Sequence, residues 1–495
     1  MNLTTDPWIP AVSADGLRAN YSLRDLFAEA HTLRDLAVKP HERIALMRLL
    51  LCITQAALDG PADEDAWADC EPSIQPAVLA YLEKWRDSFE LFGDGARFLQ
   101  CRAGLVGPKL PIMKDECISR LDLSLASGDS TPTLFDGEAG GDRTFSTAAT
   151  ALNILTYQCY SPLLGRGYLG RAPCADASAI HTIILGENLL ETVHANLLPH
   201  DSIDRCYGTG KRGCPIWEVW SSIGSEKDQN LLIGTYLGRL VPMSRSIWIN
   251  SGTKMDLANG LVYHGFDKIG YREASTTLIA KYSKEIGVLR CNAEKAAWRE
   301  LPAILINVRS NTDDGRLGGA IAIGNPHKRE LALWCGGMIF PKEQAKIEDS
   351  IESRYSVPSS LFDSFGRVAY EAGVKHAEEA DSALSKAVGS YAGTLKIDTP
   401  AYDRARQHFW TRIEQSLPDL FTVARELTAP DQLAVSPWGR AVRAAARDAY
   451  EQTCPRGTPR QIQAYALGLR SLFATAKPSK IAKAKKLKPT TTSHE

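Results

Sequence analysis

The chain from about Ser359 onward carries a pattern that only helices satisfy. Apolar residues recur every three or four positions in four successive segments, which is the spacing of one face of an α-helix. Three segments begin with a cap residue followed by proline at the first helical position, namely Thr399-Pro400, Ser436-Pro437 and Thr458-Pro459. The four stripes are Leu361, Phe365, Ala369, Ala372 and His376; Tyr402, Ala405, Phe409, Ile413 and Leu417; Trp438, Val442, Ala445 and Ala449; and Ile462, Ala466, Leu469 and Phe473. They predict a C-terminal four-helix bundle over 359–475.

Residues 1–358 predict a larger domain of mixed character. His41 to Leu58 is apolar almost all round and predicts a buried core helix. Short apolar runs separated by turns predict an antiparallel sheet, because the connections are too short for parallel strands. Further helices are expected at 74–92 and 189–198, strands at 97–111, 180–185, 303–308 and 331–334, and a bend at Gly336-Gly337 before a helix near Lys342. The fold class is therefore α+β, a large mixed N-terminal domain with antiparallel sheet elements followed by the bundle.

The last residues, 476–495, predict a disordered tail. They hold six lysines within a dozen positions and offer no apolar face to bury, as expected of an electrostatic arm.

Composition limits the compartment and the cofactors. The apolar share of 44% and charged share of 23% are those of a soluble globular protein. No run of about 18 apolar residues and no basic and apolar leader are present, so the expected location is cytoplasmic, with no membrane contact. Eleven scattered cysteines without a C-x-x-C pair argue against a disulfide framework and a zinc ribbon. The net charge of −1 means that any nucleic-acid contact must come from local basic patches.

Enzyme signatures are not found. The run Gly208 to Arg212 resembles a phosphate loop, but Arg205 stands where the Walker pattern needs glycine and Arg212 where it needs Ser or Thr. The ten histidines are dispersed and no G-x-S-x-G run occurs. The sequence therefore predicts no catalytic residues, no metal and no cofactor. A stand-alone metal-dependent nuclease or hydrolase with dispersed catalytic residues stays open as the alternative.

Two loops around a short helix are the best candidates for a binding surface. The first loop, Ser127 to Gly137, is rich in Gly, Asp, Ser and Pro. A helix capped by Thr144 or Ser146 should follow, with a stripe of Ala148, Leu152, Leu155 and Cys159. The second loop, Pro162 to Arg171, interleaves glycines, which permit close backbone approach, with arginines, which suit phosphates. A solvated pair of loops is the other interpretation.

Two further polar residues stand in turn-rich surroundings. Lys254 lies in a hairpin-like connection from Asn250 to Asp256, where a lysine can project. Gln344 stands at an expected helix start. Taken alone, the default interpretation of Lys254 is solvent exposure, and that of Gln344 is helix capping or solvent exposure.

Taken in order, these pieces resemble the large subunit, CasA, of the type I-E CRISPR surveillance complex Cascade. The resemblance is carried by Asn2-Leu3 with Asp6-Pro7-Trp8-Ile9-Pro10, the 127–136 loop, the glycine-arginine loop, Asn259-Gly260-Leu261, Gln344-Ala345-Lys346 and the helical C-terminus. Each piece is short, and their order and spacing make the whole specific.

The resemblance implies a non-catalytic subunit of an RNA-guided complex in antiviral defence. Such a subunit reads the protospacer-adjacent motif (PAM) in double-stranded DNA, promotes duplex opening and R-loop formation, and recruits the helicase-nuclease. The implied partners are the other Cascade subunits (backbone, small and guide-end-capping), CRISPR RNA, target duplex and the helicase-nuclease effector. The implied DNA-binding residues are a glycine loop with Gly165, Arg166, Gly167, Gly170 and Arg171, a lysine finger at Lys254, and a wedge of Gln344, Ala345 and Lys346. The loop with Ser127, Gly128, Thr133, Leu134, Phe135 and Asp136 would contact guide RNA and neighbouring subunits.

The physics of the minor groove agrees with these roles. Its donor and acceptor pattern is degenerate, so a reader there depends on close backbone approach, and wedging a side chain between base pairs costs a few kcal/mol of unstacking. The chain departs from the family pattern in lacking the cysteine pairs that bind zinc in some members and in placing Arg166 between glycines.

A third hypothesis for the function is a scaffold whose bundle recruits proteins without touching DNA.

Overall fold

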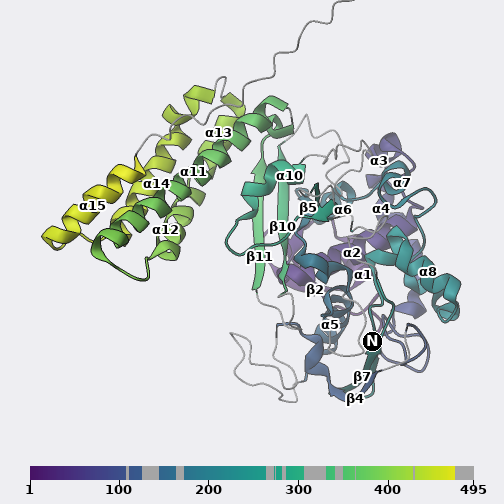
Figure 1. Ribbon diagram of the computed structural model, residues 1–495. Coiled ribbons are helices and arrows are strands. Elements are labelled where there is room, and N and C mark those ends of the chain that lie inside the picture. The colour runs from purple at the N-terminus through teal and green to yellow at the C-terminus, as the bar shows by residue number, and fades with distance from the viewer. Residues whose placement is uncertain are drawn as a thin grey trace, which may run out of the picture. The chain divides into compact units, whose positions relative to one another are not determined.

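The structure, a computed structural model, divides into two compact units, Met1–Phe362 and Asp363–Glu495. The sequence predicted a boundary a few residues earlier, at 358/359. The structure describes residues 1–107, 111–124, 144–162, 172–263, 273, 275–280, 286–305, 330–340, 349–362, 364–426 and 430–473 (Figure 1). The lysine-rich tail predicted at 476–495 lies outside these ranges. No helix within them combines the length and the apolar character needed to cross a bilayer.

The core of the N-terminal unit is organised around α2 (Pro40–Ala57), which is buried on nearly all sides. The helix predicted at 41–58 is confirmed, and its burial follows from an apolar run with no polar face. It packs against α4, α5, α6 and α9 and against β10. Two of its arginines, Arg43 and Arg48, are also buried and need partners inside the unit. The other helices are α1 (Leu23–Ala28), α3 (Glu64–Asp69), α4 (Glu71–Lys84), α5 (Thr147–Tyr160), α6 (Leu189–Ala195), α7 (His200–Tyr207), α8 (Glu226–Gly234), α9 (Tyr236–Leu240) and α10 (Leu301–Leu305).

Small sheets surround this helical centre, and every strand pairing that the structure describes is antiparallel, as predicted. The first sheet has the order β2-β1-β3, the second β11-β10-β5 and the third β4-β7-β6, and β8 pairs with β9. The strands are β1 (Ile9–Ser13), β2 (Arg18–Tyr21), β3 (Leu33–Leu36), β4 (Ile112–Cys117), β5 (His181–Leu185), β6 (Arg245–Ile249), β7 (Lys254–Asn259), β8 (Leu278–Ala280), β9 (Ile286–Val288), β10 (Leu331–Ile339) and β11 (Asp349–Val357).

Gly336 and Gly337 lie in the middle of β10, and the bend predicted there is wrong. A side chain at Gly336 would strike the Trp334 ring, and one at Gly337 would strike the carbonyl of Ala179. These glycines therefore serve close packing inside a strand paired on both sides, a use that the local sequence does not distinguish from a turn. The helix expected near Lys342 lies outside the described residues.

Other predicted elements differ from the structure. The strand expected at 303–308 is helical as far as it is described, because α10 covers Leu301–Leu305. The stretch 97–107 holds turns and an isolated bridge rather than a strand. The helix expected at 74–92 ends at Lys84 and is followed by a 3₁₀ turn, Arg86–Phe89.

The second unit is helical throughout its described residues. It contains α11 (Ser364–Leu395), α12 (Tyr402–Glu414), α13 (Leu417–Glu426), α14 (Pro437–Thr453) and α15 (Pro459–Leu472). The long α11 packs against each of the other four. The second predicted helix is divided, since α12 ends at Glu414 and α13 restarts with Leu417 and Pro418. It begins at Tyr402 with Ala401 as its cap, not at Thr399-Pro400, whereas Ser436 and Thr458 cap α14 and α15 as predicted.

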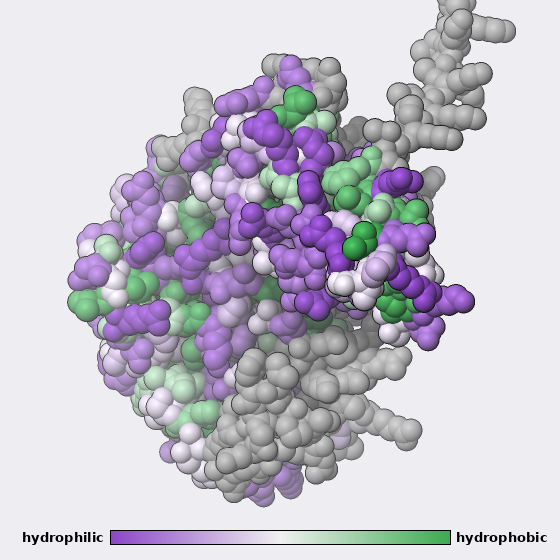
Figure 2. All heavy atoms as spheres, turned by 90° about the vertical axis from the view of Figure 1, so that its left-hand side faces the viewer, coloured by the Kyte–Doolittle hydropathy of each residue, from purple (hydrophilic) through white to green (hydrophobic). Residues whose placement is uncertain are grey.

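Not every predicted stripe faces the core of this unit. The stripe of α14 is fully buried, but Ile462 of α15 and its C-cap residue Phe473 are exposed, as is Phe365 of α11. The buried face of α15 instead holds Ala464, Tyr465, Gly468 and Leu472. A side chain at Gly468 would meet the Tyr450 hydroxyl and the Ala387 carbonyl, so small residues let α15 approach α11 closely. Figure 2 shows a largely hydrophilic surface on which hydrophobic side chains gather in small separate patches.

Candidate nucleic-acid interface

The hairpin β6–β7 carries Lys254, the one predicted DNA contact that the structure describes. Trp248 pairs with Asp256 and Ile249 with Met255, and residues 250–253 make the turn. The amides of Asn250 and Ser251 donate to the Lys254 carbonyl at 2.9 and 3.2 Å. The hairpin-like connection predicted at 250–256 is therefore confirmed, and it fixes the backbone of Lys254 at the first position of β7.

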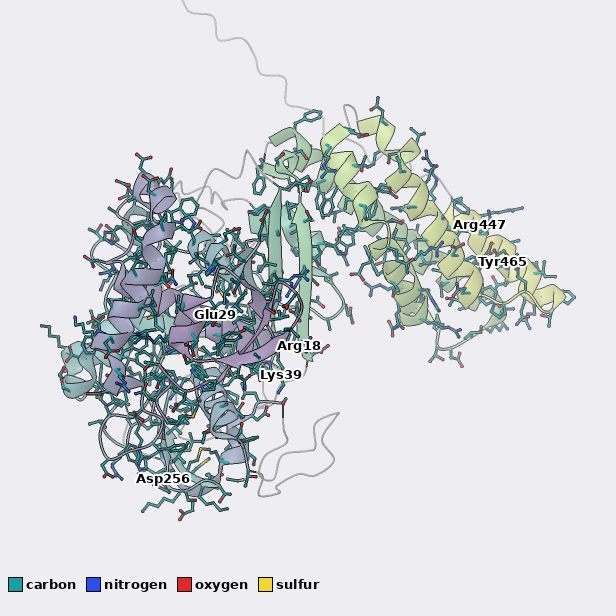
Figure 3. The ribbon with its side chains drawn as sticks, turned by 180° about the vertical axis from the view of Figure 1, so that it is seen from behind. Arg18, Glu29, Lys39, Asp256, Arg447 and Tyr465 are labelled. Carbon is teal, nitrogen blue, oxygen red and sulfur yellow. The ribbon has the colours of Figure 1, made fainter. Side chains whose placement is uncertain are left out.

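Alternation along the strands places Lys254, Asp256 and Trp248 on one face of the third sheet. Residues two apart on a strand share a face, and directly paired residues do so too. These three side chains are partly exposed, whereas Met255 and Leu257 on the other face are buried. Asp256, labelled in Figure 3, accepts hydrogen bonds from the Asn250 side chain at 3.0 Å and from the Asp115 amide at 3.2 Å. Its carboxylate thus holds the turn and the irregular part of β4.

Two arginines stack on the ring of Trp248. The guanidinium carbons of Arg97 and Arg102 lie 3.8 and 4.2 Å from its centroid. Arg97 is also fixed by hydrogen bonds to the carbonyls of Gly93 at 2.7 Å and Ile249 at 2.9 Å. Arg102 is exposed, and among the described residues the Trp248 ring is the group that its side chain contacts. A cation over an indole face is held by the ring quadrupole and keeps its N–H edges available.

The two stacked cations raise the local positive potential. The pKa of Arg97 lies below its ordinary value, because burial disfavours the cation and because Arg102 is close, while Asp94 acts in the opposite direction. An arginine remains charged with such a shift. A phosphate beside this pair would relieve the repulsion between the two arginines. We call the face formed by Arg97, Arg102, Trp248 and Lys254 the hairpin face. Its charge suits the phosphate backbone of a nucleic acid.

The residues that flank the predicted glycine loop are attached to the same hairpin. Pro162, just before the undescribed residues 163–171, accepts a hydrogen bond of 2.8 Å from the buried Arg245 at the start of β6. Ala172, just after them, donates to the carbonyl of Ser161 at 3.1 Å. Both ends of the predicted loop therefore lie at the start of β6.

The residues that flank the predicted wedge lie next to the residues that flank the glycine loop. Residues 341–348, outside the described ranges, connect β10 to β11, whose last pair is Ile339 with Asp349. Phe340 stacks on Tyr160 at the end of α5, with 6.5 Å between ring centroids. The anchors of the glycine loop and of the Gln344 segment are thus in contact, although the sequence gives no sign of this.

The first predicted loop is anchored at the other end of α5. Ser146 caps this helix, as predicted, by accepting from the Ala149 amide at 3.1 Å. The 14 residues of α5 separate the anchors of the two loops by roughly 20 Å, so the helix keeps them apart at their bases. Leu152, Leu155 and Cys159 of the expected stripe are buried, and burial extends beyond the stripe to every residue from Thr150 to Tyr160.

Most predicted site residues lie outside the described residues, and the structure does not test them. These are Gly165, Arg166, Gly167, Gly170, Arg171, Gln344, Ala345, Lys346, Ser127, Gly128, Thr133, Leu134, Phe135 and Asp136. Arg97, Arg102 and Trp248 were not predicted. Their stacking depends on the Cys101 amide, which donates to the Ile247 carbonyl at 3.0 Å and aligns the 97–102 stretch with β6, a non-local contact without a sequence signature.

Gln158 of α5 holds this scaffold together. Its side-chain amide donates to the carbonyls of Leu99 and Arg245 at 3.1 and 2.8 Å and accepts from the Arg245 amide at 2.9 Å, all in full burial. We expect Gln158→Ala to lower the free energy of unfolding by about 2–4 kcal/mol, because it leaves buried backbone groups unsatisfied. Chemical denaturation measures this. A loss below about 0.5 kcal/mol, the range of surface substitutions, would contradict the assigned role.

Across the described ranges, no group of three or more His, Cys, Asp and Glu side chains is placed to hold a metal ion.

Comparison with known proteins gives one consistent result. The family model of CRISPR-associated protein Cse1 matches residues 2–449. The chain is 26% identical over 503 residues to the CasA/Cse1 protein of Thermus thermophilus, covering 91% of this chain and 92% of that protein. It resembles the crystal structure of Thermobifida fusca Cse1 with a TM-score of 0.77 at 19% identity, covering 96% of each chain. It also resembles a chain of a structure titled "CRISPR RNA-guided surveillance complex", with a TM-score of 0.71 at 18% identity, covering 96% of this chain and 99% of that one.

Proposed function

The chain belongs to the CRISPR-associated Cse1 family, and from this premise we propose that it is the large, non-catalytic subunit of an RNA-guided surveillance complex. The family match confirms the resemblance to CasA found in the sequence motifs. The likeness to a chain of a surveillance complex over nearly the whole length supports the same role here. The partners of the subunit would be the other subunits of that complex and its guide RNA.

Within that complex, the subunit reads the PAM in target duplex and promotes its opening. The observation that carries this proposal is the common scaffold: the hairpin with Lys254, the anchors of 163–171 and the anchors of 341–348 all meet around β6 and the end of α5. A glycine loop, a lysine and a glutamine wedge on one rigid support can enter a minor groove together. Guide pairing then reads the remaining sequence, so a protein reader of a short motif is sufficient.

The hairpin face supplies the contacts to the DNA phosphate backbone that motif reading needs. Contacts to phosphate fix the position of a protein on a duplex, whereas contacts to base edges give specificity. Arg97 and Arg102 are suited to the first task and Lys254 to the second. Recruitment of the helicase-nuclease is the further role that we propose for this subunit, as its family resemblance implies.

The test is motif discrimination by the reconstituted complex. We expect Lys254→Ala to reduce the affinity ratio between duplexes with and without the motif by roughly tenfold, because one base-edge contact is lost. Lys227→Ala, at an exposed lysine of α8, is the matched control and should leave the ratio unchanged. Binding is measured by titration of labelled duplex.

Two companion variants extend this test to the segments that the structure does not describe. Gln344→Ala removes the wedge and Gly165→Asp blocks close approach of the glycine loop. If these two variants and Lys254→Ala all keep the wild-type ratio, the chain does not read the motif in the way proposed.

A further inference from the structure

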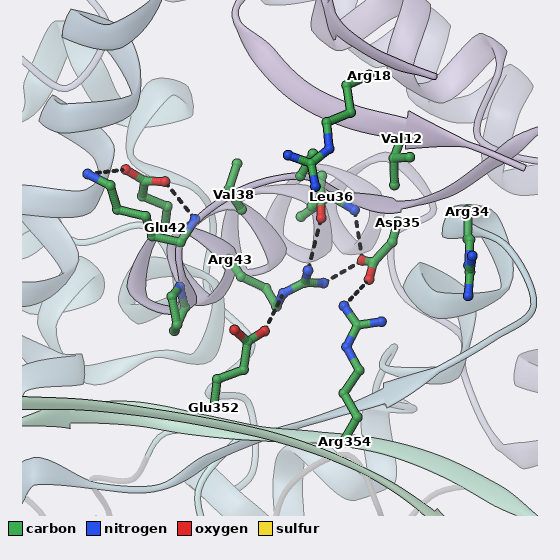
Figure 4. Close-up of a pocket in the computed structure, with 13 residues that line it drawn as sticks. Val12, Arg18, Arg34, Asp35, Leu36, Val38, Glu42, Arg43, Glu352 and Arg354 are labelled. Atoms are coloured by element: carbon green, nitrogen blue, oxygen red, sulfur yellow. Dashed lines mark hydrogen bonds and ion pairs between the residues drawn. The ribbon is translucent and has the colours of Figure 1, made fainter. Parts of the chain in front are cut away.

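A basic hollow of about 700 Å³ lies in the N-terminal unit between the first sheet, the start of α2 and β11 (Figure 4). Five cationic and three acidic residues line it: Arg18, Arg34, Lys39, Arg43 and Arg354, with Asp35, Glu42 and Glu352. The lining thus has an excess of two positive charges (five minus three), in a chain whose net charge is only −1. In the view of Figure 3, Arg18 and Lys39 lie on the same side of this unit.

The floor of the hollow is a fixed network. Arg43 is only 4% exposed; it pairs with Asp35 and donates to the Leu36 carbonyl at 2.9 Å. Asp35 also accepts from Arg354 at 2.5 Å, so that one carboxylate is bracketed by two guanidinium groups. Glu352 accepts from the Trp334 indole at 2.6 Å and lies 3.8 Å from the Nε of Arg43.

The remaining carboxylate is engaged at the start of α2. Glu42 accepts from the Lys39 amide at 2.9 Å, and the Lys39 ammonium lies 3.5 Å from its other oxygen. The same ammonium is 3.7 Å from Asp122 and donates to Ser124 at 3.1 Å. Each of the three acidic residues of the hollow therefore already has partners within the fold.

Arg18 and Arg34 complete the hollow, and among the described residues neither has an ion pair or a side-chain hydrogen bond with another residue. A β-bulge explains how both reach it. Val12 of β1 pairs with Arg18 on one side and Asp35 on the other, which aligns these side chains on one face. The register then shifts so that Ser13 pairs with Leu33, which leaves Arg34 as the extra residue and turns it toward the same hollow as Asp35.

We propose that this hollow holds a phosphodiester segment of a single-stranded nucleic acid, with Arg18 and Arg34 as its phosphate contacts. A planar guanidinium fork matches phosphate oxygens, and the fixed acids below leave two cations to be neutralised. The inference rests on the proposed function for the source of the strand, since a surveillance subunit works beside guide RNA and unwound DNA. The shared chemistry is the phosphodiester, and the experiment separates the two sources.

Arg18→Ala with Arg34→Ala is the test variant, because both side chains are exposed and their loss leaves the Arg43–Asp35 network in place. The matched control is Arg24→Ala with Arg86→Ala, two exposed arginines that do not line the hollow. The probes are labelled oligo-uridine and oligo-deoxythymidine, titrated with the full-length chain over a range of salt. We expect about tenfold weaker binding and a salt slope reduced by about 1.4, which is roughly 0.7 for each of two phosphate contacts.

Photo-crosslinking in the assembled complex identifies the strand. Guide RNA with 4-thiouridine and target DNA with 4-thiothymidine are compared, and the crosslink that the double variant loses marks the occupant. Equal oligonucleotide binding by wild type, variant and control would overturn the inference. So would equal competition by an acidic peptide of the same charge, because the hollow would then suit a protein partner.

This experiment can fail separately from the proposed function. The Arg18 and Arg34 variant is expected to keep the wild-type ratio for duplexes with and without the motif, which Lys254→Ala changes. Lost single-strand binding with normal discrimination supports the hollow alone. If the Arg18 and Arg34 variant binds single strands normally and Lys254→Ala loses discrimination, the proposed motif reading is supported and the inference about the hollow is contradicted.

Discussion

Glu273→Ala is expected to lower the free energy of unfolding by about 3–5 kcal/mol, because it leaves two buried arginines without their shared carboxylate. Glu273 lies 2.7 Å from Arg48 and 2.6 Å from Arg239, and the three side chains are 1–3% exposed. Arg239 also donates through Nε at 2.9 Å. Removing one partner of a buried ion pair is costly, since the remaining charges can neither return to water nor lose their protons.

The pH dependence gives a second measurement of the same network. Burial raises the pKa of Glu273, but the charges of Arg48 and Arg239 outweigh it and hold the pKa below its ordinary value. A carboxyl whose pKa is lowered by folding contributes stability above its unfolded pKa, near 4.3, and loses it as the pH falls through the folded value. The difference between wild type and Glu273→Ala should therefore be full at neutral pH and shrink in strong acid.

Chemical denaturation of the full chain at several pH values measures both effects. The matched control is Glu187→Ala, an exposed glutamate that should change the free energy of unfolding by less than about 0.5 kcal/mol. An equally small loss for Glu273→Ala, or a loss independent of pH down to strong acid, would show that the network is not a stabilising element of the unit.

Local patterns predicted the elements that depend on local physics. The apolar run of α2 and the caps of α14 and α15 each depend on residues that are close together in the sequence, so the sequence pattern predicts them directly. The face that α15 buries depends instead on how closely it can approach α11, and Gly468 decides this against the more apolar stripe with Ile462. Tertiary packing thus overrode the hydrophobic pattern there.

The candidate site divides in the same way. Lys254 was identified because a turn signal and a motif lie beside it in the sequence. Trp248 and Arg102 come together only when the 97–102 stretch aligns with β6, and Arg34 reaches the basic hollow only through a bulge against β1. Pairings between distant segments leave no periodic trace, so residues of this kind cannot be found from one sequence.

Reversing the charges on the hairpin face should have the largest effect on DNA binding. For Arg97→Glu with Arg102→Glu we expect roughly 100-fold weaker binding of the complex to target duplex at physiological salt, because two phosphate contacts become repulsive. The slope of log affinity against log salt should fall by about 1.8, which is roughly 0.9 for each contact. Arg24→Glu with Arg86→Glu is the matched control, equal in number and sign of charge at two exposed arginines that are not part of the hairpin face.

The effects of the two arginines can also be measured separately, because their side chains make different contacts within the protein. Arg97 holds the carbonyls of Gly93 and Ile249, so Arg97→Ala should weaken both folding and binding. The described side-chain contacts of Arg102 are confined to the Trp248 ring, so Arg102→Ala should leave the melting temperature nearly unchanged and still lower the salt slope by about 1. Thermal unfolding and duplex titration of the same preparations decide this. An unchanged salt slope for Arg102→Ala would place the DNA elsewhere, since a cation that touches phosphate must release a counterion when it binds.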